Sequence, residues 1–359
     1  TMGGVDEALI NIHHKLNDLC HSLDPTRLTV MANLSMLPAD SPMNHIPDAF
    51  SYNHYFGWYG GKVEDNGPWL DACHAQLPDK AFGLSEYGCE AILKWHTSNP
   101  RCGDYTEEYQ AYYHEKMLET FANRPFLWST AVWNMFDFGS DMRDEGGVAG
   151  RNNKGLVTFD RKTRKDSYFI YKAWWSKIPF VHICGRRYLE RAEEISQVKV
   201  YSNCERVSLY VNNQLVEEKE GRYVFTFHVL LKMGENILTV QSGDQSDEIT
   251  LIRVETPNPD YVLPFGDEEI ANWFDEKGEK VVFEFPEGYF SVRDSIDDIM
   301  KNPMAAAIIT DALGAMMKNF SMGGMEIPPE FMGMLGSFSI ERLFSLAGMA
   351  GKKIPKGLR

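Results

Sequence analysis

One glutamate, placed directly after an apolar segment and surrounded by aromatic residues, is the leading candidate for chemistry in this chain. Glu86 follows the apolar run 81–85 and precedes Tyr87-Gly88. A carboxylate at the carboxyl end of a strand can act on a ligand bound in the adjoining loops. Taken alone, Glu86 would be an ordinary loop glutamate. Its neighbours change that, because aromatic faces stack on sugar rings while amides and carboxylates bind sugar hydroxyls. The aromatic and polar residues that gather at the ends of the apolar segments are Tyr52, Asn53, His54, Tyr55, Phe56, Trp58, Tyr59, Trp128, Trp133, Asn134 and Asp137.

The segments that carry these residues alternate between helical and strand-like patterns. Hydrophobic periodicity predicts helices over 5–23, 68–76, 107–122 and 166–175, and short buried strands over 28–32, 49–55, 81–85 and 126–133. This α/β alternation predicts a parallel sheet covered by helices. About four strands are half of a (β/α)₈ TIM barrel, whose active site forms at the strand carboxyl ends. We therefore expect residues 1–178 to be the C-terminal part of such a barrel.

The pattern changes after residue 178. Residues 179–257 show several short segments of period-two alternation, among them 198–201, 207–211, 223–227, 237–240 and 249–254. Asn212-Asn213 is typical of a hairpin turn. These features predict an all-β, Ig-like antiparallel β-sandwich over 179–257. Residues 258–359 begin at a Pro-rich boundary and predict a mixed, mainly helical and Met-rich C-terminal region, with helices over 294–320 and 339–350.

Composition excludes several functional classes. The formal net charge is −15 and Lys and Arg form no long run, so the basic footprint of a nucleic-acid-binding protein is missing. No segment approaches the ~18 consecutive apolar residues of a membrane-spanning helix. The six cysteines are scattered without a CxxC pair, which argues against a structural zinc site and indicates reduced thiols. We expect a cytoplasmic protein without metal ligands. Because the chain starts at Thr1, we also expect it to be trimmed, with its native N-terminus not visible.

Four ordered motifs give the chain a family resemblance. Ser51-Tyr-Asn-His-Tyr-Phe-Gly-Trp-Tyr59, Leu84-Ser-Glu-Tyr-Gly88, Val132-Trp-Asn-Met-Phe-Asp-Phe138 and Asn152-Asn-Lys-Gly-Leu-Val-Thr-Phe-Asp-Arg161 resemble the C-terminal half of the catalytic barrel in glycoside hydrolase family 2. The following sandwich resembles the domain that follows this barrel in bacterial β-galactosidases. The resemblance implies a retaining glycosidase that forms a covalent glycosyl-enzyme.

The resemblance also implies roles for single residues. Glu86 matches the nucleophile, and Tyr55 matches a tyrosine that hydrogen-bonds it and favours its ionised form. Trp133 matches the sugar-platform tryptophan. Asn152 and Lys154 match an Asn-x-Lys pattern at the rim of the sugar pocket, which in β-glucuronidases grips the sugar carboxylate; alternatively, Lys154 is a loop cation or pairs with an acid. Asn53, His54 and Tyr59 are further candidates for binding substrate, with core packing an equal alternative for His54.

The acid/base glutamate of this family belongs to an Asn-Glu motif, which we expect upstream of Thr1. Asp6 and Glu7 instead suit a helix start, where acids stabilise the helix dipole. We therefore expect the 359-residue chain alone to be inactive, and substantial turnover by it would refute this. No cofactor is evident; a magnesium or sodium ion belongs to the longer family enzymes, with ligands upstream.

The preferred function is a β-galactosidase-like enzyme acting on a terminal β-linked sugar. A β-glucuronidase of the same family is the alternative. A non-catalytic carbohydrate-binding or scaffolding module is an alternative of another class. The expected partner is a carbohydrate such as a β-galactoside. Whether the protein forms a homo-oligomer stays open.

Overall fold

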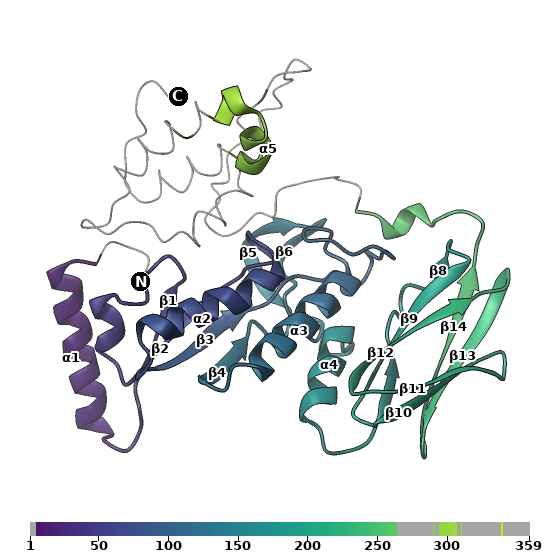
Figure 1. Cartoon of the computed structure of the whole chain (residues 1–359), viewed down its shortest axis with the longest axis horizontal. Helices are drawn as coiled ribbons and strands as arrows, with labels where there is room; N and C mark the ends of the chain where they lie inside the picture. Colours follow the sequence, from purple (N-terminus) through teal and green to yellow (C-terminus); the bar gives the residue numbers. More distant parts are fainter. Residues whose placement is uncertain (1–4, 264–289, 291–293, 307–309, 311–338, 340–359) are drawn as a thin grey trace. The chain divides into compact units, whose positions relative to one another are not determined.

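The alternating segments of the first part of the chain form a four-stranded parallel sheet (Figure 1). The computed structural model describes residues 5–263, 290, 294–306, 310 and 339. These residues divide into two compact units, which are described separately. The first unit contains 5–87, 120–132 and the described residues beyond 270, and the second contains 88–119 and 133–263.

The sheet of the first unit has the strand order β1-β2-β3-β4, and each pair of neighbours is parallel. Its strands are β1 (Val30–Leu34), β2 (Ala49–Asn53), β3 (Ala81–Tyr87) and β4 (Leu127–Val132). The helices of this unit are α1 (Glu7–Leu23) and α2 (Asn66–Gln76), with short 3₁₀ turns η1 (Pro42–His45) and η2 (Val63–Asp65). This confirms the predicted parallel α/β arrangement, and closure of the sheet into a barrel stays a prediction.

Aromatic packing fixes one face of this sheet. The rings of Phe50 and Phe82, on adjacent strands, stack with centroids 5.1 Å apart. Trp69 of α2 packs edge-on against Tyr52 at 5.4 Å. Aromatic pairs of this kind contribute about 0.5–1.5 kcal/mol each beyond the area they bury. The ends of β2 and β3 therefore project from a rigid, helix-covered base.

The outer edge of the same sheet is less covered than the sequence predicts. The apolar stripe of the first helix is present, but Ile12, Leu16 and Leu19 are each about half exposed, at 52–53%. Val30 of β1 is 50% exposed, so the prediction of a buried first strand is wrong. The physical reason is that, among the described residues, β1 pairs with β2 alone and forms an edge. Asp6 is the N-cap of α1, where its carboxylate accepts a hydrogen bond from the Leu9 N–H at 2.7 Å.

The second unit joins helices, a hairpin and a β-sandwich. The helix α3 (Glu107–Ala122) begins in it, and α4 (Asp166–Trp175) lies wholly within it. The hairpin consists of β5 (Phe138–Glu145) and β6 (Val148–Asn152), joined at Gly146-Gly147, both with positive φ. Sequence patterning did not predict this hairpin, because its strands carry few apolar residues. The 3₁₀ turn η3 (Pro259–Tyr261) follows the sandwich.

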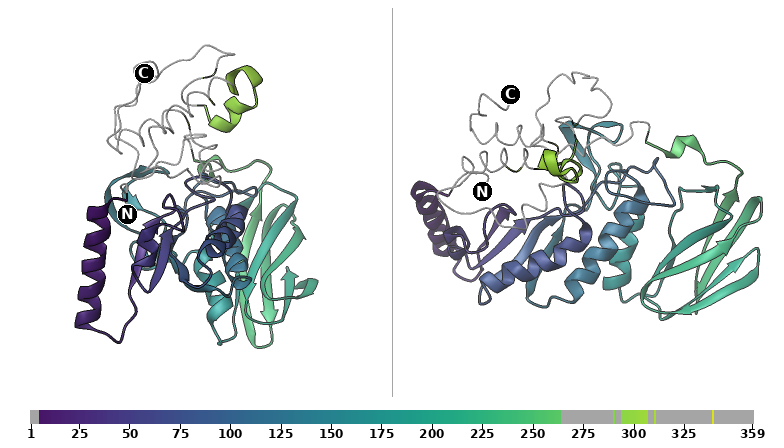
Figure 2. Two further views of the ribbon diagram at one scale, coloured as in Figure 1. Left: turned by 60° about the vertical axis from the view of Figure 1, so that its left-hand side comes forward. Right: turned by 45° about the horizontal axis from the view of Figure 1, so that its top comes forward.

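The sandwich confirms the all-β prediction for the middle of the chain (Figure 2). One sheet has the order β11-β10-β13-β14-β8 and the other β12-β9-β7. A core of Val, Ile, Leu and Phe side chains fills the space between them. Asn212 and Asn213 have φ of 49° and 64°, as the predicted tight hairpin turn requires. One detail departs from the antiparallel prediction, since β8 pairs with β14 in parallel. The strands are β7 (Val181–Ile183), β8 (Glu190–Arg191), β9 (Ile195–Ser202), β10 (Arg206–Val211), β11 (Gln214–Glu220), β12 (Tyr223–Leu230), β13 (Gly234–Ser242) and β14 (Gln245–Arg253).

Little of the C-terminal region falls within the described residues. The short helix α5 (Ile296–Met300) begins at the Ser295 N-cap. The remainder of the helices predicted over 294–320 and 339–350 lies almost entirely outside the described residues. The domain boundaries at 178/179 and 257/258 stay predictions. In the described part of the chain, no helix combines the length and hydropathy needed to cross a bilayer.

Candidate functional site

Glu86 lies near the carboxyl end of β3 and receives a hydrogen bond from a neighbouring strand end. The Tyr55 hydroxyl donates to Glu86 Oε2 at 2.7 Å, the contact expected from the motif resemblance. Both residues are half-buried. A hydroxyl that donates to a carboxylate stabilises its ionised form, as a nucleophile requires.

A β-bulge decides which face of the sheet carries Glu86. Leu84 pairs with Tyr52, but the next residue of β2, Asn53, pairs with Glu86 instead of Ser85. Ser85 is the extra residue, and its hydroxyl donates to Asn53 Oδ1 at 2.8 Å. Bulges often re-aim a side chain beside a functional site. Here the bulge moves Glu86 away from the face that carries Leu84 and places it beside Asn53.

His54 lies on the opposite, helix-covered face. It is fully buried and stacks on Trp69 with ring centroids 3.7 Å apart and planes 8° from parallel. Burial lowers the pKa of His54 to about 3, so its ring is neutral at ordinary pH. The alternation that places Tyr52 against α2 continues to His54, which explains this position. The geometry supports core packing for His54 rather than contact with sugar. Tyr59 is half-buried and packs against Tyr55, with centroids 5.1 Å apart.

The other predicted substrate-binding residues lie in the second unit. Trp133 follows β4, is half-buried, and meets Phe138 edge-on at 5.9 Å. Asn152 ends β6 and is buried, and its Oδ1 accepts the backbone N–H of Lys154 at 3.1 Å. Lys154 is also buried, and its Nζ donates to Glu90 Oε1 at 3.0 Å. The predicted alternative that Lys154 pairs with an acid is therefore confirmed.

Glu90 is the centre of a buried charge cluster, which we call the Glu90 cluster and define as Glu90, Arg143, Glu145 and Lys154. Arg143 of β5 donates to the same Glu90 Oε1 at 3.0 Å and to Glu145 Oε1 at 3.3 Å. Although burial alone would raise the pKa of Glu90, Lys154 and Arg143 hold it below its ordinary value. Burial raises the pKa of Glu145 to about 7. Glu90 therefore stays ionised, whereas Glu145 changes charge near neutral pH.

A second buried cation holds the loop that carries Lys154. Lys165 Nζ donates to Asp137 Oδ1, Ala91 O and Asn153 O, each at 2.8 Å. Asp137 Oδ1 also accepts the Gly155 N–H at 2.9 Å. A Cβ at Gly155 would lie 2.0 Å from the Asp137 nitrogen, so only glycine fits there. Asp137, a candidate for sugar binding in the sequence, is thus occupied in holding this loop.

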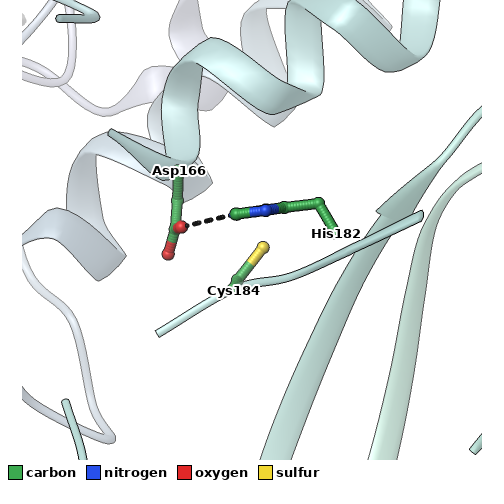
Figure 3. Close-up of side chains that lie close together, drawn as sticks. All are labelled: Asp166, His182 and Cys184. Atoms are coloured by element: carbon green, nitrogen blue, oxygen red, sulfur yellow. Dashed lines mark hydrogen bonds and ion pairs between the residues drawn. The ribbon is translucent and has the colours of Figure 1, made fainter. Parts of the chain in front are cut away.

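Asp166, His182 and Cys184 form a cluster with the residue types of a metal site (Figure 3). Their ligand atoms lie within 4.8 Å of one another. Asp166, however, already accepts hydrogen bonds from His182 Nε2 at 3.0 Å and the Gly185 N–H at 2.7 Å. The Arg187 guanidinium lies 3.7 Å from Asp166 Oδ1, and its charge opposes a metal cation. Burial also raises the pKa of the Cys184 thiol, which disfavours the thiolate that a metal needs. These contacts indicate that the cluster is a buried polar contact that links α4 to β7.

The structure thus assembles the predicted site residues in two groups. Asn53, Tyr55, Tyr59 and Glu86 belong to the first unit, whereas Trp133, Asn152 and Lys154 belong to the second. Sequence reasoning missed Glu90, Arg143, Glu145 and Lys165. The signal that was available is a lone glutamate between Cys89 and the apolar pair Ala91-Ile92. A charged residue in such surroundings is rarely buried unless it is paired.

Comparisons with known proteins point to glycoside hydrolases. No protein-family model matches the chain. A β-glucuronidase of Bacteroides fragilis is 36% identical over 250 residues, which are 66% of this chain and 35% of that protein. The structure of an FMN-binding β-glucuronidase from Facaelibacterium prausnitzii L2-6 matches with a TM-score of 0.72 and 55% identity, over 73% of this chain and 41% of that one. A Bacteroides fragilis structure described as a candidate β-galactosidase matches with a TM-score of 0.63 and 36% identity, over 68% of this chain and 38% of that one.

The chain therefore spans well under half the length of these relatives. Over about two thirds of its own length, it is similar to glycoside hydrolases named β-glucuronidase or β-galactosidase.

Proposed function

We propose that the intact protein is a retaining β-glucuronidase in which Glu86 is the nucleophile. The observation that carries this proposal is the 2.7 Å hydrogen bond from Tyr55 to Glu86 beside the bulge of β3. It supplies an oriented carboxylate at the carboxyl end of a parallel strand, where sites of α/β enzymes form. The comparisons support the β-glucuronidase alternative better than the β-galactosidase preference, because the structure with 55% identity and one of the two relatives with 36% identity are named β-glucuronidase, whereas the other relative with 36% identity is named β-galactosidase.

The reaction then follows the double displacement of retaining glycosidases. The Glu86 carboxylate attacks the anomeric carbon, and the bond from this carbon to the leaving oxygen breaks. An acid/base glutamate of the intact protein protonates the leaving oxygen. Water then attacks the glycosyl-enzyme, the same glutamate removes its proton, and Glu86 is released as a carboxylate. Tyr55 holds Glu86 in its attacking orientation and stabilises its charge at the start and the end of the cycle.

To recognise a glucuronide, the protein needs a group that binds a carboxylate at the sugar C5 better than the hydroxymethyl group that a galactoside carries there. Lys154 is the proposed cation for this carboxylate, and Asn152 supplies an amide beside it, as the Asn-x-Lys resemblance implies. The Glu90 cluster supports this assignment through its charge. Lys154 and Arg143 carry two positive charges against the single negative charge of Glu90, and Glu145 adds a second negative charge only when ionised. With Glu145 protonated, an anionic sugar neutralises the cluster, whereas a neutral sugar leaves it charged.

The test compares nitrophenyl β-glucuronide and β-galactoside as substrates of the intact polypeptide. We expect a clear preference for the glucuronide and loss of turnover in Glu86→Gln. Lys154→Met should lower kcat/KM on the glucuronide roughly 30-fold or more, since truncating one partner of a buried charge contact costs about 2 kcal/mol or more. A preference for the galactoside would favour the β-galactosidase alternative.

A non-catalytic carbohydrate-binding module makes a different prediction. In that case the intact polypeptide would bind sugar without turning over either substrate, and Glu86→Gln would change nothing. Trapping a glycosyl adduct on Glu86 with a mechanism-based glycosidase inhibitor, followed by peptide mass spectrometry, separates the two classes directly.

A further inference from the structure

We infer that Glu90 is the positioning residue that fixes Lys154 for the sugar carboxylate, an inference that rests on the proposed β-glucuronidase function. Glu90 lies in the loop after β3, only four positions beyond Glu86. In our mechanism Glu90 contacts no reacting atom. Its effect passes through Lys154 and through the backbone that carries it.

The contacts of Glu90 reach both the side chain and the backbone of the Lys154 segment. Oε1 accepts hydrogen bonds from Lys154 Nζ and from Arg143 Nη1, each at 3.0 Å. Oε2 accepts the backbone N–H of Asn153 at 3.2 Å. The Glu90 side chain is 1% exposed, so water cannot replace these contacts readily. One carboxylate therefore sets where the ammonium lies and how the chain beside it runs.

The segment is held from its other side by an independent cation. Lys165 donates to the Asn153 carbonyl at 2.8 Å, while the Lys154 carbonyl accepts the Asn134 N–H at 3.3 Å. The backbone therefore keeps anchors when Glu90 is changed. The side chain of Lys154 has four methylenes and many rotamers, so loss of the Glu90 contact allows its ammonium to occupy several positions. Removal of Glu90 should affect the ammonium more than the loop.

The charge of the cluster separates this role from that of a simple structural ion pair. If Glu90 and Lys154 merely neutralised each other, the pair would contribute nothing to binding of an anionic sugar. Arg143 shares Glu90 Oε1 with Lys154 and also pairs with Glu145, so while Glu145 is protonated the four groups together keep one positive charge. Glu90 thus holds two cations close together while its single negative charge neutralises only one of them. An acidic sugar meets an ordered, net positive group.

The matched control is a second buried glutamate that pairs with an arginine in the same unit. Glu107 is fully buried, and its carboxylate accepts hydrogen bonds from Arg187 and from the Asp166 N–H at 2.7 Å. Glu107→Gln removes one negative charge from a buried ion pair, as Glu90→Gln does. In the described part of the chain, the Glu107 carboxylate bonds to Arg187 and to the Asp166 N–H, neither of which is a proposed sugar-binding residue, so its variant reports the cost to the fold alone.

The experiment measures kcat and KM for nitrophenyl β-glucuronide in the intact polypeptide, together with the Ki of free glucuronate and of the neutral sugar glucose. For Glu90→Gln we expect the KM and the glucuronate Ki to rise about 10–100-fold, by analogy with the loss of affinity seen when the hydrogen-bond partner of a metal-binding residue is removed. The kcat should change less than about threefold, since the contact binds ground state and transition state alike. The glucose Ki should not change, and Glu107→Gln should leave all three constants near wild type.

Glu90→Asp keeps the negative charge on a side chain that is one methylene shorter. It serves as the second test variant if Glu90→Gln does not fold. We expect it to raise KM by an intermediate amount. The inference is overturned if folded Glu90→Gln or Glu90→Asp keeps the wild-type glucuronate Ki, or loses glucose and glucuronate affinity equally. In that case a wild-type enzyme that still prefers glucuronide leaves the proposed function standing. A wild-type enzyme without glucuronidase activity overturns both.

Discussion

Lys165 offers a direct test of how the loop carrying Lys154 is held, and it can be made on the 359-residue chain without any enzyme assay. The ammonium is fully buried and donates to one carboxylate and two carbonyls, each at 2.8 Å. Lys165→Met keeps the aliphatic stem and removes all three donors. Breaking a buried ion pair by deleting one partner costs about 3–5 kcal/mol, because the other charge is left uncompensated. Here the stranded charge is Asp137, whose pKa burial already raises.

For a unit of roughly this size, each kcal/mol lowers Tm by about 2–4 °C, so we expect Lys165→Met to lower the Tm of the second unit by about 6–20 °C. Thermal unfolding followed by near-ultraviolet circular dichroism measures this. The control is Lys116→Met, which makes the same substitution in an exposed pair with Glu119 and should cost under about 1 kcal/mol. Asp137→Asn completes a double-mutant cycle, in which Lys165→Met should cost less than it does alone. A Tm for Lys165→Met within 2 °C of wild type would refute the proposed hold on the loop.

Two further predictions concern the carboxylates of the candidate site. Tyr55→Phe removes the hydrogen bond to Glu86 and should lower kcat/KM of the intact polypeptide about 10–100-fold, as expected for a hydrogen bond to a charged group worth about 1.5–3 kcal/mol; a kcat/KM within about twofold of wild type would count against it. Burial raises the pKa of Glu145 from 4.5 to about 7, so the wild-type protein loses folding stability as the pH rises from 4.5 through 7 and the buried carboxyl ionises. Glu145→Gln cannot ionise and should therefore stabilise the chain relative to wild type at high pH. Urea unfolding at pH 5 and pH 8 should show the variant gaining at most about 3 kcal/mol between them, and an equal ΔG difference at both pH values would contradict this.

The sequence predicts the elements of this chain better than it predicts their buried charges. Helices α3 and α4 have the predicted bounds, because their apolar spacing and flanking residues mark both ends. The sandwich strands follow from period-two alternation and from the Asn212-Asn213 turn. The hairpin β5–β6 was not predicted, because its strands contain few apolar residues and its turn, Gly146-Gly147, lies in a polar stretch.

Among the site residues, the pair Tyr55 and Glu86 could be predicted because two motifs carry it. Glu90 could not, since its partners Arg143 and Lys154 lie 53 and 64 positions away and no local pattern marks such contacts. For His54 the sequence left sugar contact and core packing as equal alternatives. It stands within a motif rich in sugar-binding residue types, but strand alternation, which the sequence already contains, places it with Tyr52 on the helix-covered face.

The extra residue at Ser85 has a consequence for how this site can change during evolution or engineering. Upstream of it, Leu84 pairs with Tyr52 in the regular register, and downstream Glu86 pairs with Asn53. Without the bulge, a regular register of the same residues would place Ser85 opposite Asn53 and Glu86 opposite His54, which would turn the carboxylate toward the aromatic face. Deleting Ser85 would remove the extra residue and still leave Glu86 opposite Asn53, whereas a substitution that flattened the bulge would turn Glu86 to the other face. The orientation of the Glu86 carboxylate therefore depends on the bulge as well as on the identity of residue 86, and a variant that lacks Ser85 tests whether the bulge itself is needed for activity.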